Sequence, residues 1–305
     1  KAHLLMRKRI LIRIRLNKSK RKGMGVSQNE TRAFLLALSA NRKSLYFILR
    51  HPHPLFKGEN MKRIALMVFK CFPKVPYWFY RVCRYGSIED THTEQERYCY
   101  LRMIIKKVNK SGRVTVDGYG IRHIPQEKGF ILFPNHQGMF DMLAIIDTCD
   151  QPLSVVVKKE AANIILVKQV IALLRGLSID RQDIRESMKV IGQMTEEVKE
   201  GRNYVIFAEG TRSKDENQIL PFKAGTFKSA VNAKCPIVPV ALIDSFRPFD
   251  ISSIKKETVQ VHYLKPIYPE EYAGKKTTEI AEIVHDRIQE EINRILRNSS
   301  DGGKI

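Results

Sequence analysis

Phe130-Ile-Leu-Phe-Pro-Asn-His-Gln-Gly-Met-Phe-Asp141 joins a short apolar run to a polar cluster. The run ends at Pro134 and is too short for a helix, so it predicts a buried strand. His136 would then lie where the strand gives way to a loop, and Asp141 where a helix expected over 142–148 begins. Ligand sites of open α/β sheets gather at the carboxyl ends of strands, so both side chains are candidates for a site.

His136 and Asp141 form a possible base and its partner. On one continuous helix, side chains five residues apart would point about 140° away from each other. The two can meet only if the backbone bends between them, and Gly138 is the residue that would allow the bend. A carboxylate on one imidazole nitrogen fixes the tautomer, so that the other nitrogen can take a proton from a hydroxyl. The spacing by itself is a weak signal, because a surface histidine beside a helix-capping aspartate is a common alternative.

Two other kinds of catalytic site find little support in the sequence. The nearest other histidine, His123, has no ligand cluster around it, so no metal is expected. No Gly-x-Ser-x-Gly motif is present, so the nucleophile would have to be a hydroxyl of the substrate.

Short apolar runs alternate with amphipathic stretches through most of the chain. Strands are expected over 113–117, 130–133, 154–157, 177–179, 204–207, 237–243 and 258–264, and helices over 94–109, 142–148, 160–174 and 225–233. A further helix begins after Asp183, and a last one carries an apolar face from Ile280 to Ile295. Repeated β-α alternation predicts an α/β fold, with a mixed, largely parallel sheet flanked by helices.

Charged side chains also follow three more of the predicted strands: Lys158, Asp180 with Arg181, and Glu209 to Arg212. Arginine offers a planar fork of donors that matches a phosphate, and Glu209 is expected to hold the Arg212 guanidinium in place. A polar loop with a surface arginine fits this last motif alone equally well. If neighbouring strands are parallel, however, His136 and these cations gather at one edge of the sheet, as a cationic pocket around a base.

The charge of the chain is unevenly distributed. Its 305 residues carry a net charge of +21, and residues 1–50 hold 14 Lys and Arg against one acid. A basic tail of this kind contacts nucleic acid, anionic lipid headgroups or nothing in particular. The 43% apolar content is that of a globular chain. Five cysteines without paired metal-ligand spacing fit reduced thiols better than a disulfide framework.

Residues 45–88 differ from the tail because they mix aromatic and basic side chains. The segment includes the only tryptophan, Trp78, beside Tyr77 and Tyr80, and interleaves them with lysines and arginines. Such a helix suits a membrane interface, where rings lie at the depth of the headgroups. A helix that packs on the rest of the chain, with its basic side chains in water, is the alternative. No apolar run approaches the ~18–20 residues needed to span a bilayer.

Four motifs occur in order: Asn135-His136-x4-Asp141, Gly176-x3-Asp180-Arg181, Phe207-x-Glu209-Gly-Thr-Arg212 and Ile237-Val-Pro239-Val. Together they resemble the four blocks of the glycerolipid acyltransferase family, most closely its 1-acylglycerol-3-phosphate acyltransferases. The resemblance covers roughly residues 113–267. It departs from the family at three positions where many members have Pro, Ser and an aromatic residue: Ala208, Gly138 and Ser178. None of these departures removes a charged group.

The resemblance implies a reaction and a role for each motif. An acyl group would pass from acyl-CoA or an acyl carrier protein to the sn-2 hydroxyl of lysophosphatidic acid, giving phosphatidic acid for phospholipid synthesis. No cofactor besides the acyl donor and no nucleic-acid partner is implied. His136 would act as general base, supported by Asp141 of the same HX4D motif. The residues expected to bind the acceptor phosphate are Arg212, Glu209, Gly210, Thr211, Arg181, Asp180 and Lys158. Those expected to line the acyl chain are Ile237, Val238 and Pro239.

The resemblance also implies an amino-terminal helical element that docks on the bilayer without crossing it, which favours the membrane interpretation of residues 45–88. A polybasic tail would add about 1 kcal/mol for each Lys or Arg near an anionic leaflet. We therefore expect a basic tail without stable structure over 1–44, the docking segment over 45–88, a catalytic domain over 89–298 and a short tail over 299–305. The protein would lie peripherally on the cytoplasmic face of a membrane, with the lipid surface as a partner.

Two other interpretations stay open. The acceptor could be glycerol-3-phosphate or another lysophospholipid, since the motifs do not distinguish these. A protein of a different class, which binds membranes or nucleic acid through its basic tail and catalyses nothing, would leave the four motifs without a role.

Overall fold

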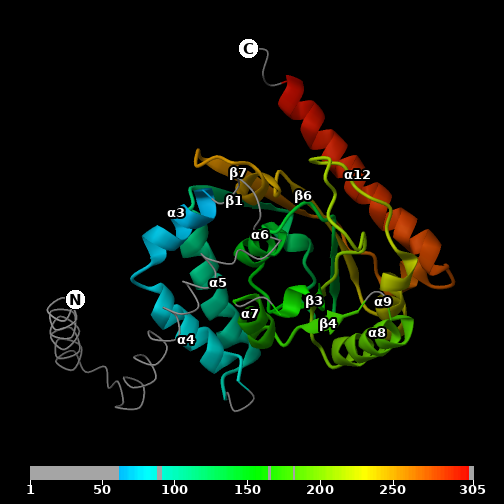
Figure 1. Ribbon diagram of the computed structural model, residues 1–305. Coiled ribbons are helices and arrows are strands. Elements are labelled where there is room, and N and C mark those ends of the chain that lie inside the picture. The colour runs from blue at the N-terminus through cyan, green and yellow to red at the C-terminus, as the bar shows by residue number, and fades with distance from the viewer. Residues whose placement is uncertain (1–61, 88–90, 164–165, 181–182, 302–305) are drawn as a thin grey trace, which may run out of the picture. The chain divides into compact units, whose positions relative to one another are not determined.

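The strand predicted ahead of His136 is β2 (Ile131–Pro134), and it lies inside a seven-stranded sheet. Figure 1 shows the computed structural model, which describes residues 62–87, 91–163, 166–180 and 183–301. All of these residues belong to one unit, Pro54–Ile305. Every residue of β2 is buried, because the strand has neighbours on both sides and helices over both faces of the sheet.

The sheet is mixed and largely parallel, as predicted, with the strand order β1-β7-β6-β2-β5-β3-β4. Its other strands are β1 (Val114–Tyr119), β3 (Ser154–Lys158), β4 (Leu177–Ile179), β5 (Tyr204–Val205), β6 (Ile237–Ile243) and β7 (Glu257–Tyr263). Strands β6 and β7 pair antiparallel, and the other neighbours pair in parallel. Strands β1 and β7 therefore run opposite to the other five.

This strand order decides which segments share an edge of the sheet. The carboxyl ends of β6, β2, β5, β3 and β4 lie at one edge, and those of β1 and β7 lie at the other. Strand β5 is inserted between β2 and β3, although it follows β4 in the chain. The prediction that the strand ends carrying the four charged clusters meet at one edge is confirmed, and the cluster nearest to that of β2 is the one that follows β5.

Helices cover both faces of the sheet (Figure 1). One face is covered by α3 (Lys62–Cys71), α4 (Val75–Tyr85), α5 (Glu94–Ser111), α6 (Asp141–Thr148) and α7 (Val167–Leu173). The other is covered by α8 (Ile184–Lys199), α9 (Lys228–Ala233) and α12 (Thr277–Asp301). Shorter helical turns are η3 (Ile121–His123), η4 (Ala161–Asn163), η5 (Ala224–Phe227), α10 (Arg247–Asp250) and α11 (Pro269–Tyr272).

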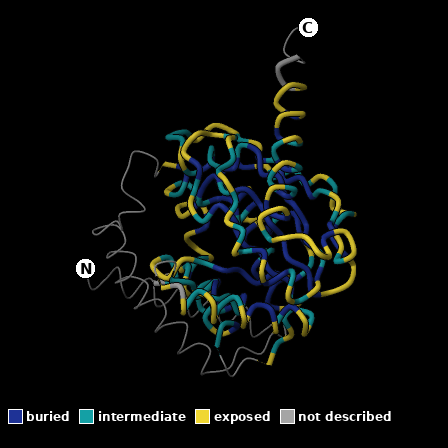
Figure 2. The backbone as a smooth tube through the Cα atoms, turned by 90° about the vertical axis from the view of Figure 1, so that its right-hand side faces the viewer, coloured by how far each residue is buried: buried dark blue, intermediate teal, exposed yellow. Residues whose placement is uncertain are grey.

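The sheet separates two hydrophobic cores, which appear as the buried interior in Figure 2. Successive side chains of a strand point to opposite faces, so Leu132 belongs to the core under α5 and α6, while Ile131 and Phe133 belong to the other. Phe133 stacks on Phe227 with ring centroids 4.2 Å apart. The apolar face predicted for the last helix is confirmed, since these residues of α12 are buried in the second core: Ile280, Val284, Ile288, Ile292 and Ile295.

One predicted helix is interrupted. The sequence indicates a continuous helix over 160–174, but the structure has the short turn η4 followed by α7, which begins only at Val167. Leu166 precedes α7 with a φ of +78°. A residue with a positive φ cannot continue a right-handed helix, so the chain must restart its helix after this position.

Part of the segment predicted to dock on a membrane forms α3 and α4. A turn over 72–74 separates the two helices, and Pro76 lies in the first turn of α4, where proline is tolerated. The Arg63 side chain is fully buried and donates to the carbonyls of Gly112 and Lys255 at 2.8 and 2.9 Å, which anchors α3. Trp78 is 8% exposed. The tryptophan therefore packs on the domain and is not free to lie at a headgroup layer.

The remaining predicted segments lie wholly or partly outside the described residues, including 1–44, 45–61 and 302–305. The domain boundaries proposed from the sequence therefore stay predictions. Among the helices of the described residues, none combines the length and the apolar content that crossing a bilayer requires.

Candidate active site

His136 and Asp141 meet beyond the carboxyl end of β2. The His136 Nδ1 lies 2.7 Å from Asp141 Oδ2, so the backbone bends as the sequence requires. Asp141 is in the first turn of α6 and its side chain is 1% exposed, whereas that of His136 is 22% exposed. Because a carboxylate accepts, the ring nitrogen that faces it carries the hydrogen. The other nitrogen, Nε2, then has a lone pair with which to accept a proton.

Three further donors hold the Asp141 carboxylate. The backbone N–H of Gln137 donates to Oδ2 at 2.8 Å, and that of Gly138 donates to Oδ1 at 3.0 Å. The hydroxyl of Ser245, which follows β6, also donates to Oδ1. A carboxylate removed from water is stable only when such donors replace its hydration. Donors that follow the parallel strands β2 and β6 therefore hold the Asp141 carboxylate in place as the partner of His136.

Gly138 allows the bend for a different reason from the one expected. Among the described glycines, a positive φ occurs at Gly120, Gly129, Gly201, Gly210 and Gly274, and Gly138 does not share it. A Cβ on Gly138 would lie 3.1 Å from Phe246 Cα and 3.1 Å from Asp250 Oδ2. The requirement is space for the segment that follows β6, and not a left-handed backbone.

Asn135 continues the pairing of β2 with β6 through its side chain. The N–H of Leu242 donates to Asn135 Oδ1 at 2.7 Å, and Asn135 Nδ2 donates to the Leu242 carbonyl at 3.1 Å. The amide thus replaces a backbone ladder pair, so the main chain can turn away while the strand end stays attached. His136 is placed by this turn.

Gln137 ties the site to the segment after β6. Its Oε1 accepts from the Ser245 N–H at 2.9 Å, and its Nε2 donates to Asn217 Oδ1 at 2.8 Å. Asn217 in turn donates to Asp244 at 3.0 Å. The roles of Ser245, Gln137 and Asn217 were not predicted from the sequence, because nothing in their local spacing shows that three distant segments meet here.

Glu209 supports His136 instead of Arg212. Its side chain is buried, and its two oxygens accept from the backbone N–H groups of His136 at 2.7 Å and Leu220 at 3.3 Å. The predicted grip on the Arg212 guanidinium is therefore not what this carboxylate does. Burial raises the pKa of Glu209 to about 7, with Asp141 adding to the rise and the two backbone donors opposing it.

The turn from Glu209 to Ser213 carries the expected phosphate-binding residues. Gly210 has a φ of +75°, which favours glycine there. Thr211 is exposed and Arg212 is half-buried. The N–H of Ser213 donates to the His136 carbonyl at 2.8 Å, so this turn lies directly beside the histidine.

Asp250, at the end of α10, lies close to the histidine bend, since a Cβ on Gly138 would be 3.1 Å from its Oδ2. Burial raises the pKa of the Asp250 carboxyl, and the positive charge of Arg212 opposes that rise. The Asp250 carboxylate and the Arg212 guanidinium therefore act on each other across the site. Asp250 belongs to no sequence motif, and nothing in the sequence indicated that it lies here.

The predicted cations farther along the edge are engaged in ion pairs of their own. Lys158 lies 3.0 Å from Glu160. The neighbouring Lys159 lies 3.5 Å from Asp180 and 3.3 Å from Glu186. Arg181 is outside the described residues. The structure thus brings the clusters after β2 and β5 into contact and leaves Lys158 and Asp180 at the ends of β3 and β4.

The residues predicted to line the acyl chain lie at the start of β6. Ile237 pairs with Ile131, Val238 with Leu132 and Pro239 with Phe133 in the parallel register of β2 and β6. All three β6 residues are buried. Their role toward an acyl chain stays a prediction.

A groove of about 810 Å³ lies at the opposite edge of the sheet, where β1 and β7 end. Arg122, His123, Lys265 and residues of α12 line it. None of the four sequence motifs contributes to this groove. Within the described ranges, no three His, Cys, Asp or Glu side chains are grouped so that they could hold a metal ion.

A histidine held by a buried aspartate, beside a turn that carries an arginine, is an arrangement that can accept a proton from a hydroxyl. Residues 115–243 match the model of the family described as Acyltransferase. Residues 115–243 are thus similar to this family, and over them the resemblance inferred from the four motifs is confirmed.

The similar proteins agree with this assignment. The chain is 30% identical over 152 residues to the 1-acyl-sn-glycerol-3-phosphate acyltransferase of Salmonella typhimurium. The aligned region covers 50% of this chain and 62% of that protein. It is 29% identical over 180 residues to the Escherichia coli protein of the same name, covering 57% of this chain and 73% of that protein. The crystal structure of the acyltransferase PlsC from Thermotoga maritima has the same fold, with a TM-score of 0.63 and 22% identity over 78% of this chain and 98% of that one.

The raised pKa of Glu209 predicts that the free energy of unfolding depends on pH. Its pKa of about 7 lies above the ordinary value of 4.5, so between these pH values the unfolded chain loses a proton that the folded chain keeps. The stability that Glu209 contributes is therefore complete below pH 4.5 and falls as the pH rises to about 7. Relative to Glu209→Gln, the wild type should lose roughly 2–3 kcal/mol of unfolding free energy between pH 5 and pH 8.

Urea denaturation at the two pH values measures this difference. Glu282→Gln, which changes an exposed carboxylate on α12, is the control and should follow the wild type. Equal pH dependence in the wild type and in Glu209→Gln would show that Glu209 titrates like an exposed acid.

Proposed function

We propose that this chain transfers a fatty acyl group from a thioester to the sn-2 hydroxyl of 1-acylglycerol-3-phosphate, which produces phosphatidic acid. The observation that carries the proposal is the contact between the two clusters: His136 is held by Asp141 on one side and by the turn of Glu209, Arg212 and Ser213 on the other. The proposed base and the proposed phosphate-binding arginine thus lie on two segments that are hydrogen-bonded to each other. The activity in the names of the Salmonella and Escherichia coli relatives supports the same reaction.

In the proposed mechanism, His136 Nε2 removes the proton of the acceptor hydroxyl as its oxygen attacks the thioester carbonyl carbon. The new C–O bond forms, the C–S bond breaks, and the imidazolium returns the proton to the leaving thiolate. Asp141 stabilises the imidazolium and keeps the ring oriented throughout. The acyl donor, acyl-CoA or an acyl carrier protein, is a co-substrate, and the proposal requires no other cofactor.

The acceptor is oriented through its phosphate. Arg212 offers a fork of donors to the phosphate oxygens, and Gly210 and Thr211 form the turn that presents it. Lys158, Asp180 and Arg181 are proposed as outer members of the same subsite, and Ile237, Val238 and Pro239 as the lining of the acyl chain. Glu209 is a positioning residue, because its carboxylate accepts from the N–H groups of His136 and Leu220 and so holds the turn against the histidine.

His136→Ala tests the base directly. The variant should lose at least ~100-fold in kcat/KM with lysophosphatidic acid and a thioester donor, because general base catalysis contributes about 10²–10⁴-fold. His285→Ala is a matched control, since His285 also lies close to an aspartate, at 3.1 Å from Asp286, but on the surface of α12. Turnover that survives in a folded His136→Ala protein would rule out His136 as the base. A panel containing glycerol-3-phosphate and other lysophospholipids identifies the preferred acceptor.

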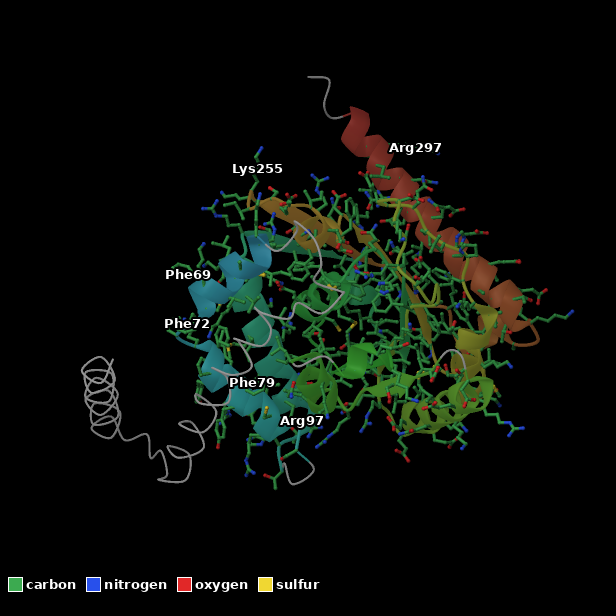
Figure 3. All side chains as sticks on the ribbon, viewed as in Figure 1. Phe69, Phe72, Phe79, Arg97, Lys255 and Arg297 are labelled. Carbon is green, nitrogen blue, oxygen red and sulfur yellow. The ribbon has the colours of Figure 1, made fainter. Side chains whose placement is uncertain are left out.

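We further propose that one face of α3 and α4 docks on a lipid surface. Apolar side chains on this face are exposed: Phe69 to 80%, Phe72 to 56%, Tyr77 to 49% and Val68 to 37%. Phe69 and Phe72 are labelled on the outer side of these helices in Figure 3. The basic residues Lys62, Lys70 and Lys74 are exposed beside them. Exposed aromatics flanked by lysines favour an interface of anionic headgroups and acyl chains.

The opposite face of the same helices packs on the domain through Met67, Cys71, Trp78 and Val82. The two interpretations offered by the sequence therefore apply to different faces of one segment. A protein attached in this way would meet its lipid acceptor at the membrane and a soluble donor from the aqueous side, which is why we propose a peripheral location on the cytoplasmic face.

Replacing Phe69 and Phe72 by Ser should weaken binding of the full chain to vesicles of phosphatidylcholine and phosphatidylglycerol at least tenfold. Burial of one phenylalanine contributes about 1.5–3 kcal/mol, and two are removed. Sedimentation in 0.5 M salt isolates this apolar part, because salt screens the attraction of the lysines. Met188→Ser removes an exposed apolar side chain from α8 and should bind normally. Unchanged binding of the Phe69/Phe72 double variant would reject this docking face.

A further inference from the structure

Lys223 lies at the base of the turn that carries Arg212. Its N–H donates to the Ala208 carbonyl at 2.9 Å, which closes the loop formed by residues 209–222. The chain then enters η5, for which Lys223 is the residue before the first turn. Lys223 belongs to none of the four sequence motifs.

The side chain of Lys223 crosses over Gly210. The point that a Cβ on Gly210 would occupy lies 2.7 Å from Lys223 Nζ, 2.8 Å from Cε and 3.2 Å from Cδ. The ammonium is therefore directly against the backbone of Gly210, two residues before Arg212. Any larger residue at this position would displace it, in addition to the strain of the φ of +75°.

The positive charge at this turn is not neutralised as it is elsewhere along the edge. Lys158 is paired with Glu160, and Lys159 with Asp180 and Glu186. Within the ranges that the structure describes, neither Arg212 nor Lys223 takes part in an ion pair. The negative charge of Asp250 acts on Arg212, and Lys223 brings a second positive charge to this turn.

We propose that Lys223 is the second phosphate-binding cation of the acceptor site and, with Arg212, selects a phosphate monoester. The inference rests on the proposed function and deepens it. A phosphate monoester carries close to two negative charges at neutral pH, and a guanidinium fork with an ammonium point charge matches both its charge and its geometry. A phosphodiester headgroup carries one negative charge on the phosphate and so gains less from Lys223. The ammonium lies against Gly210, two residues before Arg212 in the same turn.

A structural role for the lysine stem makes a different prediction. If the methylenes only cover Gly210, Lys223→Met keeps that packing and changes little. If the ammonium binds phosphate, Lys223→Met should raise the KM for lysophosphatidic acid about 10- to 100-fold with kcat within a few-fold, as expected for loss of one charged hydrogen-bonding group. Lys223→Arg should restore most of the loss. Lys228→Met, an exposed lysine on α9, is the matched control.

Two further measurements separate this inference from the proposed reaction. Turnover of an uncharged monoacylglycerol should be unaffected by Lys223→Met, since it has no phosphate to lose. Calorimetric binding of glycerol-3-phosphate to the full chain does not depend on turnover and should weaken at least tenfold. Equal glycerol-3-phosphate binding by the wild type and Lys223→Met overturns the role of Lys223, whether or not the chain acylates lysophosphatidic acid. A wild type inactive on lysophosphatidic acid overturns the proposed function alone.

Discussion

The buried carboxylate of Asp141 is the group on which the rest of the site depends. An ionised side chain away from water needs donors, and here they come from His136, from the backbone of Gln137 and Gly138, and from Ser245. Ser245 follows β6, so these contacts require β2 and β6 to be parallel neighbours that end at the same edge. The order of the sheet and the orientation of the base are therefore linked, because separating the two strands would remove the Ser245 donor from a buried carboxylate.

A second carboxylate extends this constraint to the neighbouring strand on the other side. Glu209 follows β5 and accepts the His136 N–H, while the Ser213 N–H donates to the His136 carbonyl. Both backbone polar groups of His136, its N–H and its carbonyl, are therefore hydrogen-bonded to the turn that carries Arg212. A phosphate bound to that turn, as we propose, would fix the base at the same time as it orients the acceptor, which is how a site gains rate from positioning.

The sequence predicted what periodicity and spacing determine. Strand ends and the largely parallel sheet follow from local patterns, and the structure confirms them. The pairing of His136 with Asp141 was implied by the resemblance of the four motifs, since its spacing alone is a weak signal, and the structure places the two side chains 2.7 Å apart. The sequence did not predict that Glu209 turns toward a backbone N–H, or that Ser245 completes the site, because both depend on which strands are neighbours. Strand β5 enters between β2 and β3, an order that no local pattern specifies. The break at Leu166 was missed for a similar reason, since an apolar residue gives no warning of a positive φ.

The ring of His136 offers the most direct measurement of this arrangement. Its two nitrogens can be distinguished by their ¹⁵N chemical shifts in protein labelled at histidine. The geometry predicts that the neutral ring carries its hydrogen on Nδ1, toward Asp141, and keeps Nε2 free to accept a proton, and that Asp141→Asn shifts the ring toward the other tautomer. A wild-type ring with its hydrogen on Nε2 would contradict the role of Asp141 and, with it, the assignment of His136 as the base.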